Sequence, residues 1–359
     1  MRAAEGEEVM IFETVADGGC KSYVVGCHQT CTGAIIDPTL NQIDRYQGIA
    51  NREGLKIRAI FETHTHADHF SAAAQLAKHF GAQVVMHRES PAPHVDLQVE
   101  DGHLVPVGQL KFHVLHTPGH TRDSVCYYVE DRVFTGDTLL IGGTGRSDLP
   151  SGDPKQLYSS LFDKLLKLPP ETQVYPAHDY KNLGSSTIGA EIAENRRLKP
   201  RTEAEFVQLM EGLNLAAPTH LTEALRTNMT GGKTVQQMLG EASKSVPFVS
   251  LEELNSRLSQ KRNDLIILDV RERDAYSTGH IPGALHLARG QLELKVDENF
   301  PDPGVEIVTV CTVGKISTLA AATLRELGFL RAVALDGGVK QWREAGFPID
   351  SGEDPALLI

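Results

Sequence analysis

The chain has 359 residues, more than one ordinary domain holds, so we expect two domains. Hydrophobic residues make up 41% of it and charged residues 23%, which is typical of a soluble globular protein and argues against a disordered or fibrous one. The formal net charge of -12 argues against a nucleic-acid partner, because phosphate contacts require a basic surface. No run approaches about eighteen apolar residues, and the first ten residues lack the features of a signal peptide. We therefore expect a cytoplasmic protein without a membrane span.

Cysteine and histidine usage gives the first indication of chemistry. The five cysteines form an odd and sparse set, which favours reduced thiols over disulfides. They are Cys20, Cys27, Cys31, Cys126 and Cys311. Fifteen histidines is a high number for this length, and several lie between residues 63 and 69. This cluster suggests a metal site.

The first half of the chain predicts short strands separated by turns, with helices at intervals. Strands are expected at residues 22–25, 34–36, 56–62, 83–87, 110–116, 124–129 and 132–135. Helical spacing is found at residues 71–80, 155–168 and 188–197, and Pro154 suits a helix start. This pattern predicts sheets packed together with helices outside them.

From residue 246 onward, continuous apolar strands alternate with helices. Strands are predicted at 265–270, 305–310 and 332–335, and helices at 251–258, at 317–327 and around Trp342. Such alternation is typical of a parallel α/β sheet. The boundary is predicted near residues 231–246, which gives one domain at 1–240 and a second at 246–359.

The stretch 231–234 ends like a phosphate-binding loop, with Gly232, Lys233 and Thr234. The earlier glycine that such a loop requires is missing, because position 227 is a threonine. No predicted strand leads into the stretch either. We therefore predict no nucleotide site there.

The densest group of potential metal ligands follows the strand predicted at residues 56–62. His64, His66, Asp68 and His69 stand within six residues. In an extended chain, side chains two residues apart point to the same face, so His64, His66 and Asp68 converge.

Three further candidate ligands stand singly, each beside turn residues: His120, Asp137 and His178. Turns that follow strands are where a scaffold commonly presents functional side chains. A single histidine is more often a packed or surface residue. Together with the preceding cluster, however, these three indicate a metal site.

These seven positions, in this order, resemble the metallo-β-lactamase superfamily over residues 9–240, and the resemblance implies an αββα sandwich. The ligand pattern is specific for the fold and much less so for the reaction. A dinuclear zinc thioester hydrolase of the glyoxalase II type is one alternative that the ligands leave open.

The flanking segments resemble persulfide dioxygenases. They are residues 61–69, 135–141, 145–148, 175–180, 213–215 and 228–229. In that family one iron is held by the residues that match His64, His120 and Asp137. Two histidines and one carboxylate suit Fe(II) with open positions for O2 and a sulfur ligand, whereas zinc has no redox change with which to activate O2. The resemblance implies one Fe(II) per chain.

The other four positions of the pattern carry no metal in persulfide dioxygenases. We expect His66, Asp68, His69 and His178 to orient the ligands through hydrogen bonds or to move protons.

The resemblance also implies the substrates. They are glutathione persulfide and O2, and the products are sulfite and glutathione. Arg146 matches a residue that holds the glutathione end, and Tyr180 lines the same pocket; a loop salt bridge for Arg146 and packing on His178 for Tyr180 are the structural alternatives. Where relatives often have cysteine before the Gly-Arg pair, this chain has Thr144.

Cys311 stands between a predicted apolar strand and a helix. Backbone N–H groups of the loop 311–316, the helix N-terminus and Lys315 would stabilise negative charge on its sulfur. The segments 268–272, 279–284 and 335–339, with Trp342, resemble the rhodanese family over residues 246–350. This resemblance implies that Cys311 carries sulfane sulfur and that Lys315 binds substrate. Many relatives have arginine where this chain has Ile316, so we expect weak thiosulfate binding or preference for another donor, for which Lys315 compensates only in part.

The two resemblances together imply an iron-dependent persulfide dioxygenase joined to a rhodanese that transfers sulfur between thiosulfate and glutathione. The partners expected are these small molecules; a homo-oligomer is left open. Two alternatives stand beside this interpretation. One is the zinc hydrolase, and the other is a non-catalytic sulfur sensor or carrier.

Overall fold

A computed structural model describes residues 10–352, apart from 201, 214, 217–220 and 261–264. The chain divides into two compact units, Met1–Gly232 and Lys233–Ile359. Among the described residues, no helix has the length and apolar character needed to cross a membrane.

The first sheet of the N-terminal unit is mixed. It contains, in spatial order, β1 (Met10–Asp17), β2 (Cys20–Cys27), β3 (Thr32–Ile36), β4 (Lys56–Phe61), β5 (Gln83–His87) and β6 (Leu97–Val99). The first three strands pair antiparallel, and β3 to β6 pair in parallel. The carboxyl ends of β3, β4 and β5 therefore share one edge of the sheet.

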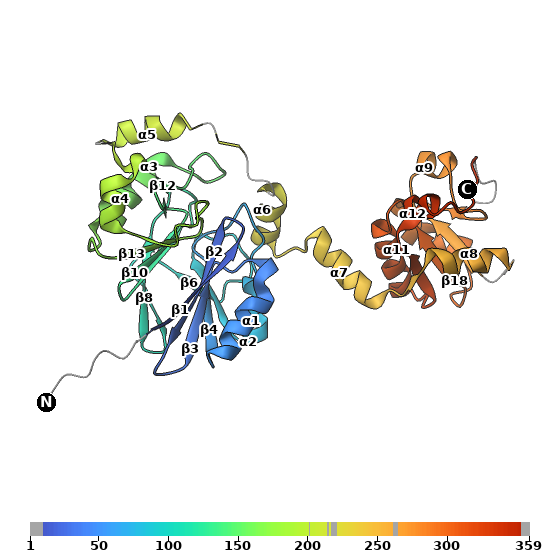
Figure 1. The fold of residues 1–359 in the computed structure, drawn as a ribbon, viewed down its shortest axis with the longest axis horizontal. Coiled ribbons are helices and arrows are strands. Elements are labelled where there is room, and N and C mark those ends of the chain that lie inside the picture. Colours follow the sequence, from blue (N-terminus) through green and yellow to red (C-terminus); the bar gives the residue numbers. More distant parts are fainter. Residues whose placement is uncertain (1–9, 201, 214, 217–220, 261–264, 353–359) are drawn as a thin grey trace. The chain divides into compact units, whose positions relative to one another are not determined.

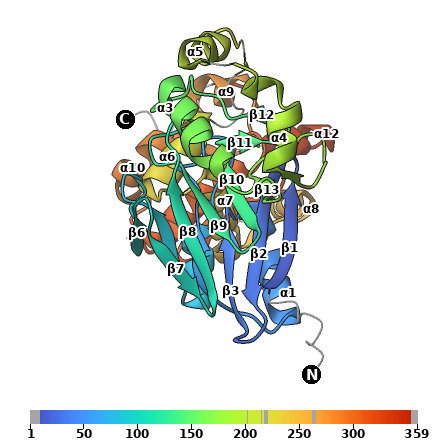
Figure 2. The same ribbon diagram turned by 90° about the vertical axis from the view of Figure 1, so that its left-hand side faces the viewer.

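The second sheet lies against the first and is mainly antiparallel (Figure 2). Its strands, in order, are β14 (Ser186–Thr187), β13 (Gln173–Pro176), β10 (Arg132–Gly136), β9 (Val125–Val129), β8 (Leu110–His116) and β7 (Leu104–Val107). Only β10 and β13 pair in parallel. A short hairpin, β11 (Leu139–Leu140) and β12 (Gly143–Thr144), follows β10.

Strand alternation builds three hydrophobic layers in this unit. Tyr23 and Phe61 lie between the two sheets, whereas Val24 and Ile60, on the opposite face, pack under α1 (Ile43–Arg52) and α2 (Ala73–Phe80). Figure 1 shows these two helices together beside β4. The outer face of the second sheet is covered by α3 (Pro154–Ser159), η2 (Ser160–Lys164), η3 (Leu165–Lys167), α4 (Ile188–Glu194), η4 (Arg196–Leu198) and α5 (Glu203–Glu211). The result is an αββα sandwich.

The C-terminal unit has a parallel sheet in the order β15 (Phe248–Val249), β19 (Ala332–Leu335), β18 (Glu306–Val310), β16 (Leu265–Asp269) and β17 (Leu285–His286). Its other elements are α7 (Val235–Ser245), α8 (Leu251–Ser259), α9 (Arg273–Thr278), η5 (Arg289–Gln291), α10 (Leu292–Asn299), α11 (Lys315–Glu326) and α12 (Gly338–Glu344). Along β18, Ile307 packs towards α10 and α11, and Val308 packs towards α8 and α12. Helices therefore cover both faces, as continuous apolar strands require.

The predicted fold class is confirmed, and so are the predicted strands that carry the site. The hairpin of β2 and β3 is present, and β5, β8 and β19 occupy the predicted residues. The sequence did not predict β1, α1 or α10. The boundary stretch 231–246 contains a helix, α7, and Thr234 begins it: its side chain accepts from the Gln237 N–H, and the Gln237 side chain accepts from the Thr234 N–H. Thr234 therefore caps the start of α7 and does not belong to a phosphate-binding loop.

Candidate metal centre and sulfur-transfer site

The candidate ligands of the N-terminal unit come from turns at the ends of several strands. His64 follows β4, and His120 lies between β8 and β9. Asp137 follows β10, and His178 follows the parallel neighbour β13. Because parallel strands end at the same edge, these turns bring together residues that are far apart in the sequence.

His64, His120 and Asp137 form one compact group. One donor atom from each lies within 4.8 Å of the others. His120 Nε2 is 3.5 Å from an oxygen of Asp137, and the two histidine rings meet edge to face with centroids 4.9 Å apart. This is the set of two histidines and one carboxylate that the sequence pointed to.

The orientation of His64 is fixed by a chain of hydrogen bonds. Thr63 donates its hydroxyl proton to Asp37 at 2.9 Å, so the same oxygen accepts from His64 Nδ1, also at 2.9 Å. The Nδ1 position therefore carries the proton, and Nε2 keeps its lone pair. His64 Nε2 is buried and has no hydrogen-bond partner among the described residues.

A backbone carbonyl fixes His120 in the same way. His120 Nδ1 donates to the Arg146 carbonyl oxygen at 2.7 Å, which leaves Nε2 as a lone-pair donor facing Asp137. Gly145 makes this contact possible, because a Cβ at that position would collide with the Asp137 carbonyl oxygen and would crowd His120 Nδ1 at 3.1 Å. The glycine of the Gly-Arg pair thus allows the loop to approach the ligands.

Charge in this group also suits metal binding. Burial, together with the nearby His66 and His120, holds the pKa of His64 well below its usual value, so the ring is neutral. Burial tends to raise the pKa of Asp137, but His178, His120 and His64 outweigh it and keep the pKa well below the usual range. Neutral imidazoles and an ionised carboxylate are the forms that bind a cation. The residues present therefore fit a metal ion, and the orphaned His64 Nε2 is the clearest sign of it.

His178 is held between two carboxylates. Its Nδ1 donates to Asp137 at 2.6 Å and its Nε2 donates to Asp68 at 2.7 Å. Burial opposes a charged ring, but these two partners raise the pKa of His178 well above its usual value. Asp68 also accepts from His69 Nδ1 at 3.2 Å. With Cys20, whose sulfur lies 3.5 Å from Asp68, these residues form a second group that could hold a cation.

His66 points into a third, fully buried group. Its Nε2 lies 2.9 Å from Glu62 and 3.3 Å from Asp37. Burial alone would lower the pKa of His66, yet the two carboxylates raise it well above its usual value. His66 is thus paired with acids, although its ring lies close to that of His64, with centroids 4.1 Å apart.

The sulfur-transfer candidate lies in the C-terminal unit. Cys311 follows β18 and is 1% exposed, and its sulfur accepts from both the N–H and the hydroxyl of Ser317 at 3.3 Å. Gly338, with a φ of +64°, brings α12 onto the loop, where the Val339 N–H donates to the Cys311 carbonyl oxygen at 2.9 Å. Lys315 begins α11 and is exposed, as is Ile316 beside it.

Comparison with known proteins bears on both units. Residues 15–178 match the metallo-β-lactamase superfamily and residues 250–345 match the rhodanese-like domain. The mitochondrial persulfide dioxygenase ETHE1 of Homo sapiens is 34% identical over 235 residues, which cover 64% of this chain and 92% of the relative. The chain belongs to the persulfide dioxygenase family.

Two solved structures resemble this chain. ETHE1 from Myxococcus xanthus is 41% identical with a TM-score of 0.61, and the match covers 62% of this chain and all of that one. A metallo-β-lactamase from Staphylococcus aureus is 25% identical with a TM-score of 0.59, and covers 92% of this chain and 99% of that one. The match to ETHE1 covers only part of this chain, whereas the match to the Staphylococcus aureus structure extends into both units.

Two positions expected to bind glutathione lie beside the ligand groups. The Arg146 guanidinium donates to Asp148 at 2.6 and 2.7 Å and to the Ala216 carbonyl at 2.6 Å, so the loop salt bridge is present. Tyr180 is 77% exposed and stacks on His178 with ring centroids 5.4 Å apart. Both side chains can be reached from solvent, and Asn214 of the neighbouring family segment lies outside the described residues.

Sequence reasoning assigned no role to several residues of the site. Asp37 directly follows β3 and Glu62 directly follows β4. Their positions at the ends of apolar strands could have marked them as site residues, because His64 also lies just after β4. Asn228 in α6 (Leu221–Thr230) donates to the carbonyls of His66 and His69 at 2.9 Å and accepts from the Ser71 N–H. No local pattern predicts such a contact, because it joins residues about 160 positions apart.

The remaining thiols are not part of these groups. All five cysteines are free. Burial raises the pKa of Cys126 to about 12, so that thiol stays protonated. Cys27 is buried and accepts from the Gln109 N–H, whereas Cys31 is exposed.

Proposed function

We propose that the N-terminal unit oxidises glutathione persulfide with O2 and water to sulfite and glutathione, using one Fe(II) per chain. His64, His120 and Asp137 would hold the iron. Fe(II) bound there would supply the redox chemistry that activates O2. The observation that carries the proposal is the orphaned, buried Nε2 of His64, which shares a site with His120 and Asp137.

The other residues of the pattern act on these ligands. The Nδ1–H of His178 donates to one oxygen of Asp137 at 2.6 Å, so the second oxygen of Asp137 remains on the side of His120. Both nitrogens of His178 are already engaged by carboxylates, so His178 offers no free lone pair to a second ion. Tyr180 and the Arg146 side chain would bind the peptide part of the persulfide.

We further propose that the C-terminal unit transfers sulfur between thiosulfate and glutathione through Cys311. The Cys311 thiolate would attack the outer sulfur of thiosulfate, forming an S–S bond as sulfite leaves. The sulfur of glutathione would then attack the bound sulfur and release Cys311 as a thiolate, so that glutathione persulfide forms. Ser317, which donates twice to the Cys311 sulfur, would stabilise that thiolate.

Metal analysis combined with O2 uptake tests the iron proposal. Protein purified without air should contain about one iron per chain, as a single facial triad predicts, and should consume O2 with glutathione persulfide. His120→Ala should lose both the iron and the O2 uptake. His79→Ala, which removes an exposed histidine on α2, should retain both.

The same measurements separate the alternatives. Two tightly held zinc ions per chain, with hydrolysis of S-lactoylglutathione and no O2 uptake, would establish the hydrolase instead. Binding of persulfide without any O2 uptake by iron-loaded protein would support a sensor or carrier.

A further inference from the structure

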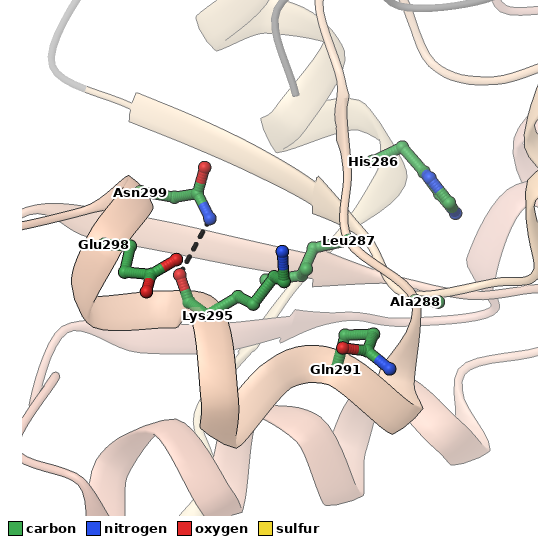
Figure 3. Close-up of a pocket in the computed structure, with 7 residues that line it drawn as sticks. All are labelled: His286, Leu287, Ala288, Gln291, Lys295, Glu298 and Asn299. Carbon is green, nitrogen blue, oxygen red and sulfur yellow. Dashed lines mark hydrogen bonds between the residues drawn. The ribbon is translucent and has the colours of Figure 1, made fainter. Parts of the chain in front are cut away.

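A small pocket in the C-terminal unit combines apolar lining with polar and charged side chains. Its volume is about 260 Å³, and it is lined by His286, Leu287, Ala288, Gln291, Lys295, Glu298 and Asn299 (Figure 3). Lys295, Glu298 and Asn299 come from α10, facing Leu287 and Ala288 after β17. The volume is below the range of about 300–1,000 Å³ for pockets that enclose a whole drug-sized ligand. It suits one end of such a molecule.

The register of the sheet places this pocket relative to Cys311. His286 pairs with Asp269 on β16, and Asp269 pairs with Val310 on β18, the residue before Cys311. Adjacent strands are about 4.8 Å apart, so the backbone of His286 lies about 10 Å from that of Val310, at the same edge. Cys311 and Leu287 also belong to one hydrophobic cluster, so the pocket and the sulfur share a face of the sheet.

The lining matches one kind of molecule. Lys295 offers an ammonium group and Glu298 a carboxylate, one turn apart on α10, while Gln291 and Asn299 offer side-chain amides. A cation and an anion side by side complement an α-amino-acid zwitterion, whose carboxylate and ammonium are close together. A simple dianion such as thiosulfate would meet the Glu298 carboxylate, which repels it. In an extended glutathione the thiol is on the middle residue, about two residue lengths or roughly 7 Å from the zwitterion. Together with the Cys311 side chain, this is comparable to the distance between the backbones of His286 and Val310.

We infer that this pocket binds the zwitterionic γ-glutamyl end of the tripeptide thiol glutathione. In this position the sulfur of glutathione reaches Cys311. The inference rests on the proposed sulfur transfer and adds the site that selects the thiol. Lys295 binds the α-carboxylate, and Glu298 binds the α-ammonium group. The bound thiol gives its proton to solvent and attacks the outer sulfur on Cys311 as a thiolate. The S–S bond to Cys311 breaks, a new S–S bond forms to glutathione, and Cys311 leaves as a thiolate.

Kinetics with two sulfur acceptors test this assignment on the full chain. Thiosulfate is the donor, and the acceptor is glutathione or cyanide, which has no zwitterion. In Lys295→Met and Glu298→Gln the KM for glutathione should rise about tenfold relative to that for cyanide, because a charge-assisted hydrogen bond is lost. Glu326→Gln, the same change at the far end of α11, should leave the KM for glutathione at the wild-type value.

An acceptor without the ammonium group tests separately whether Glu298 binds that group. N-acetylglutathione lacks the ammonium group, so the wild-type protein should have a higher KM for it than for glutathione, whereas Glu298→Gln should no longer distinguish the two. The inference is wrong if both variants keep the wild-type KM for glutathione, or if the KM for cyanide rises equally.

A binding measurement separates this inference from the proposed sulfur transfer. If wild-type protein moves no sulfur to cyanide or to glutathione, the proposed reaction has failed. S-methylglutathione, which has no thiol, can then be titrated by calorimetry. Loss of one binding site in Lys295→Met supports the pocket, and unchanged binding refutes it.

Discussion

Each proposed iron ligand presents one atom to the site and has another atom held by a neighbour. Thr63 holds His64 Nδ1, the Arg146 carbonyl holds His120 Nδ1, and His178 holds one oxygen of Asp137. These partners select the tautomer and the ring orientation before any metal arrives. The chemistry of the centre therefore depends on residues that do not touch the ion.

Thr63→Val tests the relay from Asp37 to His64. Valine keeps the shape but removes the hydroxyl, so His64 loses the acceptor that keeps its proton on Nδ1. Iron affinity should fall about 10- to 100-fold, as is usual when a ligand loses its supporting hydrogen bond. Competition with a chelator measures this affinity.

Thr65→Val is the matched control, because Thr65 is a buried threonine of the same loop that donates to Asp123 at 2.6 Å. Thr65→Val should bind iron more tightly than Thr63→Val does. Thr63→Ser keeps the hydroxyl and should have an iron affinity close to that of the wild-type protein. Equal losses in the two valine variants would point to distortion of the loop.

Arg146→Ala separates the two roles of Arg146. The backbone carbonyl that holds His120 survives the substitution, so iron content should be unchanged. Loss of the guanidinium should raise the KM for glutathione persulfide about tenfold, the cost of one charge-assisted contact. Arg122→Ala, an exposed arginine near the same ligand, should have the wild-type KM. An unchanged KM with a collapsed kcat would show that the side chain assists bond-making instead.

At the level of elements, sharp strand-to-helix turns place the reactive groups. The turn from β18 to α11 carries Cys311, and Gly314 enters α11 with a φ of +88°. Gly338 at the start of α12 lies directly against this turn, and a Cβ there would collide with the Cys311 carbonyl oxygen. Two helix starts thus shape the loop around one sulfur.

Gly338→Ala should therefore damage the sulfur-transfer loop. A left-handed backbone costs a non-glycine residue about 1–2 kcal/mol, and the collision adds to this cost. We expect the free energy of unfolding of the C-terminal unit to fall by about 2 kcal/mol or more, with loss of sulfur transfer. Denaturant unfolding measures the change. Gly240→Ala in α7, where the Cβ meets nothing within 4 Å, should be neutral or slightly stabilising.

At the level of the whole molecule, the two chemistries are carried by separate units. The candidate iron ligands all lie in Met1–Gly232, and Cys311 lies in Lys233–Ile359. Each unit has hydrophobic clusters of its own. The two activities should therefore be separable by mutation.

Cys311→Ser makes that separation. Serine keeps the size and the loop but replaces a sulfur nucleophile with a hydroxyl that stays protonated at neutral pH. Sulfur transfer from thiosulfate should vanish, while O2 uptake with preformed glutathione persulfide should persist on the same preparation. Residual sulfur transfer would exclude Cys311 as the carrier, and loss of O2 uptake would show that the units are coupled.

The sequence by itself determined the class of the fold and pointed to the candidate ligands. Strand alternation predicted β5, β8 and β19, because burial of one face leaves a period of two in the residues. His120 and Asp137 were singled out because turn residues beside strands mark where ligands are presented. The choice of these two with His64 as iron ligands came from the resemblance to persulfide dioxygenases. The eight-residue strand β1, whose burial does not alternate with a period of two, was missed.

Tertiary structure alone decided how those ligands are supported. Asp37 reaches His64 through Thr63, Asn228 closes the loop of His66 and His69 from α6, and the carbonyl of Arg146 fixes His120. These contacts join residues far apart in the chain, and one of them uses only the backbone. Local residue patterns carry no record of a partner that folding brings from a distance, so the structure was needed to find them.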